Sequence, residues 1–560
     1  MTMMKKKTAL ISVFHKEGIT EFASALKTLG WEIIASGGTA KHLKGAGVEV
    51  VDATDIVGVP ILGHRVVTLS RGIHAGLLAK RTPEHAKELE ENNIPYIDLV
   101  CVDMYPLEEE IAKGSVREAV VEMTDIGGPT MLRSGVKGGR IVICDPADRM
   151  RVIEWLREKQ ANNEDENKDE QFIRELAAKA EATVAKYVLT SAAYLGEGKY
   201  AGIAGTRTAE CLYGENGWQT PAALYSTGSA DPLSLEKFTL IEGSPLSFNN
   251  FGDLDRLLQT LTHIAAGLEV NFGANPVKSA AADHGVKIAV AVKHGNPCGA
   301  AYGESSKQVL ENVIAGDPLA IMGGVVMTNF PIGASEAETL ASFKMPQGFR
   351  RLLDAVAAPK FESEAVELLR RKKDKCRFVA NEALLTVGAT TLDNEPRIRY
   401  VRGGFLRQPN YTFVPNLNPV KSAGADHGVK RYGPAATPKV ERDLIFAWAV
   451  GSTSNSNTIT IVKAGQLLGD GVGQQDRVGA AELALRRAKR SGHDTMGAVA
   501  YSDSFFPFPD APQVLIDGGI RAIFSTSGSV RDEETIKLCE AKGIILYLVP
   551  DKEGRGFFGH

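Results

Sequence analysis

The sequence has few cysteines, few aromatic residues and almost no net charge. Its 560 residues include six cysteines, none in a Cys-x-x-Cys pair, which excludes a disulfide framework and offers no structural zinc site. The chain has 64 Lys and Arg against 68 Asp and Glu, a net charge of −4. It therefore lacks the excess of positive charge that is typical of proteins that bind nucleic acid or anionic membranes. We therefore expect reduced thiols, and neither nucleic acid nor membrane as a partner.

Long hydrophobic runs are missing as well. The basic start, residues 4–7, is followed only by an apolar stretch over 9–14, which is too short for a signal peptide. No stretch approaches the ~18 apolar residues that a membrane span needs. The chain is expected to be soluble and cytoplasmic.

What the sequence does contain is enough apolar material, 44% of residues, for roughly three or four folding units. In the first part, apolar runs of strand length over 8–13, 32–35 and 97–102 alternate with an apolar stripe of helical spacing over 19–29. Strands alternating with helices predict an α/β fold, with a mainly parallel sheet covered on both faces.

The middle of the chain suggests a domain boundary near residue 200. Residues 160–171 have almost no apolar content and predict a solvated loop before a long helix over 172–195. Residues 196–217 contain no convincing core element. The remainder is again α/β, with buried strands over 287–292 and 458–462.

One internal repeat is visible. Residues 275–287 (NPVKSAAADHGVK) and 418–430 (NPVKSAGADHGVK) differ at a single position. Two such short copies do not describe a solenoid, which needs several stacked units. They fit an inserted loop in each half, or a functional segment, since each copy carries a Lys, an Asp and a His.

Two glycine-rich turns in the first part could hold a phosphorylated ligand. Residues 36–39 (SGGT) follow a predicted strand, and residues 125–130 (DIGGPT) add a carboxylate before two glycines. Glycines let the backbone approach a ligand, and helix N-terminal amides bind phosphate. The alternatives are a plain connection and a capped helix, with Asp125 as the cap and Lys137 as a solvated charge.

The pair Lys293-His294 indicates a catalytic site more strongly than the glycine-rich turns do, because two proton-transferring side chains follow a buried strand. Neighbours on a strand point to opposite faces, so this pair must lie on a turn to act together. The alternative interpretation, a surface lysine next to a histidine that caps a loop, fits the sequence pattern alone about equally well. Pro297-Cys298 resembles the start of a zinc deaminase motif, but Ala301 stands where its second cysteine would be, which excludes that enzyme.

Eight motifs then occur in an order that identifies a known family. They are SVFHKEG at 12–18, ASGGTA at 35–40, TLSRGIHAGLLA at 68–79, MYP at 104–106, DIGGPTMLR at 125–133, KHGNPCG at 293–299, GVGQQDR at 471–477 and SDSFFPF at 502–508. From about residue 9 to residue 560 the chain closely resembles the bifunctional enzymes of the last two steps of de novo purine synthesis. These join an IMP cyclohydrolase to an aminoimidazole-carboxamide ribotide (AICAR) formyltransferase.

The resemblance implies a fold, a co-substrate and a homodimer. Residues 1–200 would form a methylglyoxal-synthase-like parallel-sheet domain, the cyclohydrolase. Residues 201–560 would form the formyltransferase, two cytidine-deaminase-like α/β subdomains without zinc, split near 375–400. The formyl donor would be 10-formyltetrahydrofolate, and no metal is expected.

The resemblance also implies site residues. For formyl transfer, Lys293, His294 and Asn457 would be catalytic, with Asn457 orienting His294. For ring closure, the catalytic residues would be Tyr105, Asp125 and Lys137. The nucleotide and phosphate contacts would be Lys16, Ser36, Gly37, Thr39, Arg65, Thr68, Gly127, Gly128, Tyr213, Asn216, Asn250, Gly324 and Asp354. The folate contacts would be Phe505 and Asp510.

This sequence departs from the family pattern at several positions. Val67 replaces the catalytic lysine of the cyclohydrolase, and Asp103 replaces an asparagine. Leu212 stands where an arginine would contact the nucleotide phosphate, and Gly217-Trp218 replaces a Pro-His pair. The alternatives to a bifunctional enzyme are therefore formyl transfer alone, a non-catalytic nucleotide-binding paralogue, and a different aminoimidazole or pyrazole nucleotide as substrate.

Overall fold

A computed structural model describes residues 6–59, 61–62, 66–161, 166–273, 285–417 and 428–559. The chain divides into two compact units, Met1–Ala204 (unit 1) and Gly205–His560 (unit 2), which are described separately. Most of both copies of the thirteen-residue repeat lies outside the described residues, so its role stays open.

Unit 1 is built on a parallel sheet of five strands in the order β3-β2-β1-β4-β5. The strands are β1 Thr8–Val13, β2 Glu32–Ala35, β3 Val51–Asp52, β4 Leu99–Asp103 and β5 Ile141–Ile143. The helices are α1 Ile19–Thr28, α2 Gly37–Gly45, α3 Thr54–Val57, α4 Arg71–Leu78, α5 Pro83–Glu91, α6 Leu107–Ala112, α7 Arg117–Glu122, α8 Gly127–Lys137, α9 Asp148–Ala161 and α10 Glu166–Leu195.

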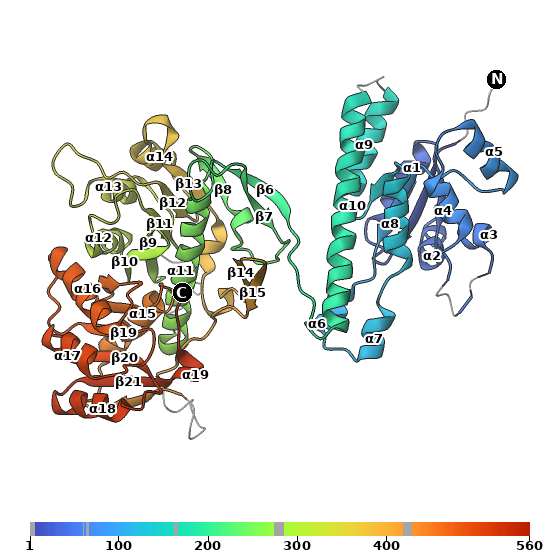
Figure 1. The fold of residues 1–560 in the computed structure, drawn as a ribbon. Helices are drawn as coiled ribbons and strands as arrows, with labels where there is room; N and C mark the ends of the chain where they lie inside the picture. The colour runs from blue at the N-terminus through green and yellow to red at the C-terminus, as the bar shows by residue number, and fades with distance from the viewer. Residues whose placement is uncertain are drawn as a thin grey trace. The chain divides into compact units, whose positions relative to one another are not determined.

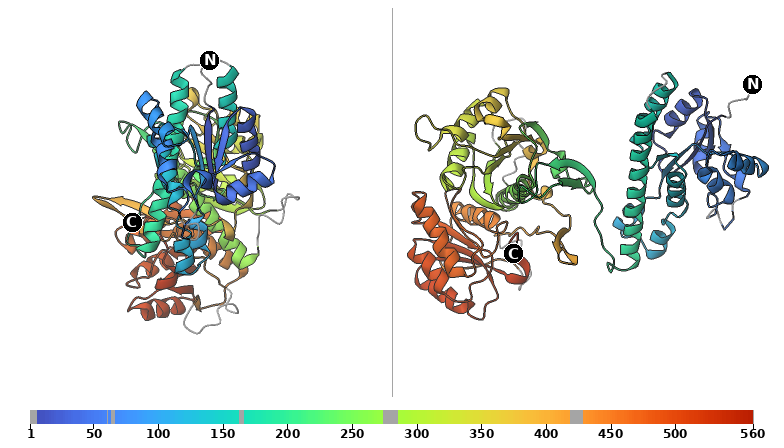
Figure 2. Two further views of the ribbon diagram at one scale, coloured as in Figure 1. Left: turned by 90° about the vertical axis from the view of Figure 1, so that its right-hand side faces the viewer. Right: turned by 45° about the horizontal axis from the view of Figure 1, so that its top comes forward.

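Helices cover both faces of this sheet (Figure 2). Alternate residues of β1 face opposite cores: Ala9 and Ile11 pack with α1 and α9, while Leu10 packs with α4, α8 and α10. This arrangement confirms the predicted parallel α/β fold of the N-terminal region. The strand order reverses between β1 and β4, and open α/β sheets bind ligands beyond the carboxyl ends of the strands at such a point.

The predicted solvated loop over 160–171 is too long. Helix α9 continues to Ala161 and α10 already begins at Glu166. Asp169 accepts a hydrogen bond from Trp155 Nε1 at 2.8 Å and forms an ion pair with Lys159, so the charged segment docks on α9. Acidic residues also suit the first turns of a helix, because they face the positive end of its dipole.

Unit 2 contains a mixed sheet of twelve strands in the order β16-β21-β20-β19-β17-β18-β10-β9-β11-β12-β13-β8, with two separate ribbons, β6-β7 and β14-β15. The strands are β6 Thr206–Cys211, β7 Ala222–Ser226, β8 Thr239–Glu242, β9 Lys287–Lys293, β10 Asn296–Gly303, β11 Val325–Thr328, β12 Ala355–Ala358, β13 Arg377–Ala380, β14 Arg397–Val401, β15 Gly404–Gln408, β16 Lys430–Tyr432, β17 Ile459–Lys463, β18 Gln466–Gly471, β19 Val499–Ser502, β20 Ala522–Ser527 and β21 Ile545–Pro550. The helices are α11 Phe248–Phe272, α12 Ser306–Gly316, α13 Ala334–Ser342, α14 Ser363–Leu369, α15 Pro438–Gly451, α16 Arg477–Arg490, α17 Asp510–Asp517, α18 Asp532–Ala541 and α19 Asp551–Gly554.

The large sheet consists of two halves with the same order of elements. In the first half α11 leads into the hairpin β9-β10 and then the parallel strands β11, β12 and β13. In the second half α15 leads into the hairpin β17-β18 and then β19, β20 and β21. The halves join where β10 pairs with β18, and α11 and α15 share one apolar core beneath the sheet (Figure 1).

The ribbon β6-β7 begins within the segment in which sequence reasoning found no core element. Its strands leave most side chains at least partly exposed, so β6 contributes no alternating apolar face. A two-stranded ribbon of this kind has no hydrophobic period by which to predict it.

Candidate functional site

The Lys293-His294 pair lies in the turn between β9 and β10. Lys293 ends β9, His294 and Gly295 form the turn, and Asn296 begins β10 opposite Lys293. His294 (φ 55°) and Gly295 (φ 71°) both have positive φ, as a type I′ hairpin turn requires. The turn frees His294 from the strand alternation that would send it to the opposite face from Lys293.

An aspartate on α11 holds this turn. Oδ1 of Asp253 accepts the N–H of Gly295 at 2.7 Å. Burial raises the pKa of Asp253, while the Gly295 hydrogen bond and the charge that His294 can carry act in the opposite direction. The Asp253 carboxylate therefore lies close enough to His294 for the charges of the two groups to interact.

The Lys293 ammonium faces the loop after α12. Its Nζ donates to the carbonyl of Met322 at 2.6 Å. Nearby, the carbonyl of Gly324 accepts the N–H of Asp354 at 3.0 Å, and the Asp354 carboxylate pairs with Arg371 at 2.7 Å. The structure thus places Gly324 and Asp354, both predicted nucleotide contacts, beside the loop that Lys293 contacts.

The second half of the sheet has the same turn without a histidine. Lys463 ends β17, followed by Ala464 (φ 55°) and Gly465 (φ 74°). Asp443 on α15 accepts the N–H groups of Ala464 and Gly465, each at 2.8 Å. Burial raises the pKa of Asp443 as it does that of Asp253. The aspartate therefore belongs to the architecture of both turns, whereas only the first turn carries an imidazole.

The loop before β17 reaches the first turn. The N–H of Asn455 donates to Oδ1 of Asn296 at 3.1 Å. The guanidinium of Arg256, on α11, donates to the carbonyls of Thr453 and Phe558 and, at 3.0 Å, to Oδ1 of Asn455. Arg256 is only 7% exposed. Helix α11 therefore fixes both the β9-β10 turn and the 455–457 loop.

Asn457 lies in this loop, and its side chain forms its hydrogen bond within the same half of the sheet. Its Nδ2 donates to the carbonyl of Gln474 at 2.9 Å. In the part of the chain that the structure describes, no hydrogen bond joins Asn457 to His294. That Asn457 orients His294 stays a prediction.

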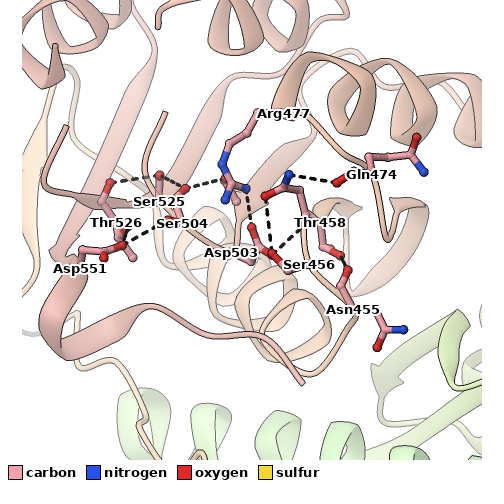
Figure 3. Close-up of polar contacts among 12 residues, drawn as sticks. Asn455, Ser456, Thr458, Gln474, Arg477, Asp503, Ser504, Ser525, Thr526 and Asp551 are labelled. Atoms are coloured by element: carbon pink, nitrogen blue, oxygen red, sulfur yellow. Dashed lines mark hydrogen bonds and ion pairs between the residues drawn. The ribbon is translucent and has the colours of Figure 1, made fainter. Parts of the chain in front are cut away.

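A buried ion pair between Arg477 and Asp503 supports the 455–457 loop (Figure 3). Arg477 binds Oδ1 of Asp503 and, at 3.2 Å, Oγ of Ser502. Oδ2 of Asp503 accepts the N–H of Thr458 at 3.1 Å, and its side chain is fully buried. The sequence motifs over 471–477 and 502–508 thus meet at the residue that follows Asn457.

Three predicted nucleotide contacts lie near the start of α11. The carbonyl of Tyr213 accepts the N–H of Phe248 at 3.0 Å, and Asn216 is exposed in the adjoining loop. Oδ1 of Asn250 accepts the N–H and the hydroxyl of Ser247, each at 3.0 Å, so this oxygen serves the helix cap.

The two predicted folate contacts follow β19. The ring of Phe505 is half-buried, and its centroid lies 5.7 Å from the guanidinium carbon of Arg555. Asp510 is the exposed first residue of α17.

In unit 1 the glycine-rich turn after β2 begins helix α2. Ser36 precedes the helix, Gly37 is its first residue, and the Ser36 hydroxyl donates to that of Ser12 at 2.7 Å. The Thr39 hydroxyl is buried, donating to the carbonyl of Val13 and accepting its N–H, each at 3.1 Å. Thr39 therefore links α2 to β1, while Ser36 and Gly37 lie at the carboxyl end of β2.

The loop after β1 meets the end of β4. Oδ2 of Asp103 accepts the backbone N–H of His15 at 2.8 Å and lies 3.1 Å from its ring Nδ1. Burial lowers the pKa of Lys16, and the Asp103 charge opposes that shift. The ring of Phe14 packs edge-on against Tyr105, with centroids 5.5 Å apart.

Asp125 joins the end of β4 to helix α8. Its Oδ2 accepts the N–H of Tyr105 at 3.4 Å, and its Oδ1 accepts that of Gly128 at 2.8 Å. A Cβ on Gly127 would lie 2.6 Å from Oγ1 of Thr68, so only glycine lets Thr68 approach so closely. Burial raises the pKa of Asp125. Tyr105, Asp125, Thr68 and both glycines therefore form one cluster.

Lys137 lies apart from this cluster, so its role in ring closure stays a prediction. It is the exposed last residue of α8, an eleven-residue helix, and lies roughly 15 Å along the axis from Gly127. Arg65 lies outside the described residues. Val67 is half-buried against the apolar core of unit 1.

Sequence reasoning assigned no role to Asp253, Arg256 or His15. Asp253 and Arg256 are three residues apart and therefore share a face of the helix that precedes the Lys293 strand. That spacing was a usable signal, since charged residues on a helix with so many apolar positions need partners. His15 gave no signal, because its partner is 88 residues away.

The described residues contain no group of three or more His, Cys, Asp or Glu side chains that could hold a metal ion. None of the described helices is long and apolar enough to cross a membrane. All six cysteines are free thiols.

Comparison with known proteins gives matches over nearly the whole chain. The family described as AICARFT/IMPCHase bienzyme matches residues 140–487, and the MGS-like domain family matches residues 18–130. The chain is similar to the bifunctional purine biosynthesis protein PurH of Oceanobacillus iheyensis, with 34% identity over 96% of this chain and 98% of the relative. It is 36% identical to PurH of Anoxybacillus flavithermus, over 97% and 98% of the two chains, and 34% identical to that of Deinococcus radiodurans, over 98% and 99%. A solved structure titled "Crystal structure of ForH" aligns with 34% of this chain and all of its own, at 31% identity and a TM-score of 0.29.

Proposed function

The chain belongs to the AICARFT/IMPCHase bienzyme family, and on that premise we propose that unit 2 carries out formyl transfer and unit 1 ring closure. The enzyme formylates the 5-amino group of AICAR ribotide and closes the product, with loss of water, to IMP. These are the last two steps of purine synthesis. Full-length similarity to proteins named as bifunctional favours two activities over formyl transfer alone or a non-catalytic paralogue.

The β9-β10 turn carries the proposal for unit 2, because it presents two proton-transferring groups on a fixed support. The formyl donor is 10-formyltetrahydrofolate. The 5-amino nitrogen attacks the formyl carbon, a new C–N bond forms, and the bond from that carbon to the folate nitrogen breaks. His294 takes the amino proton, Asp253 favours the imidazolium that results, and Lys293 supplies charge and a proton to the departing nitrogen.

In unit 1 the cluster at the carboxyl ends of β1 and β4 supports ring closure. The carboxamide nitrogen attacks the formyl carbon, and water leaves. We assign the nucleotide phosphate to Ser36, Gly37 and Lys16, which follow β2 and β1 at the carboxyl ends of the strands, next to the point where the strand order reverses. Tyr105 and Asp125 are placed to contact the closing ring. An intramolecular attack already has a large proximity advantage, to which the proton-transferring groups of the site add.

We further propose a homodimer in the cytoplasm. The two ribbons expose large apolar side chains: Tyr400 and Leu406 on β14-β15 are 80% and 60% exposed, and Tyr225 on β7 is 59% exposed. Clustered apolar side chains on a surface mark protein interfaces. Six free thiols suit a reducing compartment. Light scattering should give the mass of two chains, and a monomer at micromolar concentration would refute the dimer.

The decisive experiment mixes the protein with AICAR ribotide and 10-formyltetrahydrofolate and identifies the products by chromatography. IMP is the expected product. Accumulation of formyl-AICAR would show that unit 1 does not close the ring, and the absence of both products would refute the substrate assignment. Two variants assign the reactions to the units. His294→Ala should lose formyl transfer but still close supplied formyl-AICAR, and Asp125→Asn should do the reverse.

A further inference from the structure

A histidine–aspartate pair lies at the point where the strand order of unit 1 reverses. Strands β1 and β4 are neighbours, Val13 pairs with Asp103 in register, and His15 follows two residues after Val13. Oδ2 of Asp103 is 2.8 Å from the backbone nitrogen of His15 and 3.1 Å from its Nδ1. One carboxylate oxygen therefore fixes both the backbone and the ring of His15.

The pair leaves one ring nitrogen available. Because a carboxylate accepts the proton on Nδ1, the neutral ring of His15 carries its lone pair on Nε2. The His15 side chain is 53% exposed and that of Asp103 only 17%. Within the described residues, no group forms a hydrogen bond with Nε2. A mostly buried carboxylate bound to Nδ1, together with an Nε2 that can accept a proton, is the arrangement of a proton-transfer histidine.

The pair adjoins the candidate ring-closure cluster. The ring of Phe14 contacts both His15 and Tyr105, with centroid distances of 5.0 and 5.5 Å. Tyr105 in turn donates its N–H to Asp125. Val67 precedes Thr68, whose hydroxyl lies against Gly127 in the same cluster. The Val67 side chain can neither donate nor accept a proton.

We propose that His15, oriented by Asp103, transfers the proton during ring closure and thereby supplies the function that Val67 cannot. The inference rests on the assignment of ring closure to unit 1. As the carboxamide nitrogen bonds to the formyl carbon, the C=O π electrons move to oxygen. Nε2 of His15 takes the carboxamide proton and delivers it to that oxygen. The hydroxyl then leaves as water together with the proton of the formamide nitrogen, and the C=N bond forms.

The test measures ring closure from supplied formyl-AICAR. Because general acid–base groups contribute about 10²–10⁴-fold, His15→Ala should lower kcat by roughly 100-fold or more with a small change in KM. Added imidazole should restore part of the rate. Asp103→Asn should cost less, and the double variant should be no slower than His15→Ala. The control is His42→Ala, an exposed histidine of the same unit that lies 3.2 Å from the Thr20 hydroxyl; it should leave the rate unchanged.

A second variant keeps the proposal falsifiable if the alanine variant is damaged in other ways. Val67→Lys in the His15→Ala background should recover ring closure, because a cation and proton donor returns to the cluster. If His15→Ala closes the ring as fast as the unmodified enzyme, the proposal is refuted while the assigned function stands. If neither imidazole nor Val67→Lys restores a lost rate, the role of His15 is structural and the proposal is refuted. If the unmodified enzyme does not close the ring at all, the function assigned to unit 1 fails instead.

Discussion

The most discriminating perturbation of unit 2 is Asp253→Asn, because the chain contains its own matched control. Asp253 accepts the turn N–H groups of Gly295 and His294, and Asp443 accepts those of Gly465 and Ala464 in a turn that has no histidine. Asparagine keeps one oxygen acceptor in either position and removes the negative charge. The two variants therefore share a structural cost and differ in the electrostatic one.

The structural cost follows from the hydrogen bonds. A bond to a charged acceptor is worth about 1.5–3 kcal/mol and a neutral one about 0.5–1.5 kcal/mol, so each substitution should lower the free energy of unfolding by about 1–2 kcal/mol. The electrostatic cost concerns only Asp253, which in the proposed mechanism stabilises the imidazolium of His294 during transfer. His294 is exposed, so solvent screens the attraction, and we estimate about 1.4 kcal/mol, a tenfold loss of kcat.

The assay measures formyl transfer, with ring closure of supplied formyl-AICAR in the same sample as an internal control. Asp253→Asn should lose about tenfold in kcat with KM nearly unchanged. Asp443→Asn should stay within about twofold of the unmodified enzyme at similar stability. Equal losses in the two variants would refute the electrostatic role of Asp253 and leave only the support of the turn.

Three further predictions concern other residues of unit 2. Arg256→Met removes the buried cation that holds the 455–457 loop, so it should lower the free energy of unfolding by about 3–5 kcal/mol and reduce formyl transfer. Arg256→Lys should lose less of both. Equal formyl transfer in the Met variant and the unmodified enzyme would contradict that role. Burial raises the pKa of Asp470 to about 7, so the folded state binds a proton that the unfolded state releases between about pH 4 and 7, and stability falls as pH rises through that window. Asp470→Asn should remove this fall, by up to about 2.7 kcal/mol between pH 5 and 8 in denaturant titrations, and an unchanged pH dependence would exclude Asp470 as its source. Leu212→Arg should raise kcat/KM for the ribotide about 10–100-fold and leave the riboside unaffected, because only the ribotide offers a phosphate to the guanidinium; equal effects on both would remove Leu212 from the phosphate site.

Much of the fold could be predicted from local pattern. The strands over 8–13 and 32–35 match the structure residue for residue, because each is a mostly apolar run of strand length next to a segment of a different pattern. The start of α10 could not be predicted, since its first turns are charged and depend on contacts of Asp169 with α9. The ribbon β14-β15 was missed for a related reason: its strands are largely exposed and have no buried face to set a period.

The site was predictable only where one short segment carries the chemistry. Lys293 and His294 are adjacent in sequence, and a strand before them suffices to place them at a sheet edge. Residues that support them come from far along the chain, such as Asp253, 42 residues before Gly295. Lys137 was assigned to ring closure from the family resemblance alone, and it lies at the opposite end of α8 from Gly127 and Gly128.

The repeated architecture of the two halves of unit 2 separates what the hairpin turn requires from what we propose for catalysis. A lysine, a residue with positive φ, a glycine and a supporting aspartate recur in both, so this set is a requirement of the hairpin. Function depends on what differs: His294 occupies the position of Ala464, and the loop that faces His294's turn, through Asn455 and Asn296, comes from the other half. The proposed formyl-transfer site is thus asymmetric although its scaffold is repeated. It follows that Ala464→His alone should not create a second site, because a histidine there would still lack the loop that the second half contributes to the first.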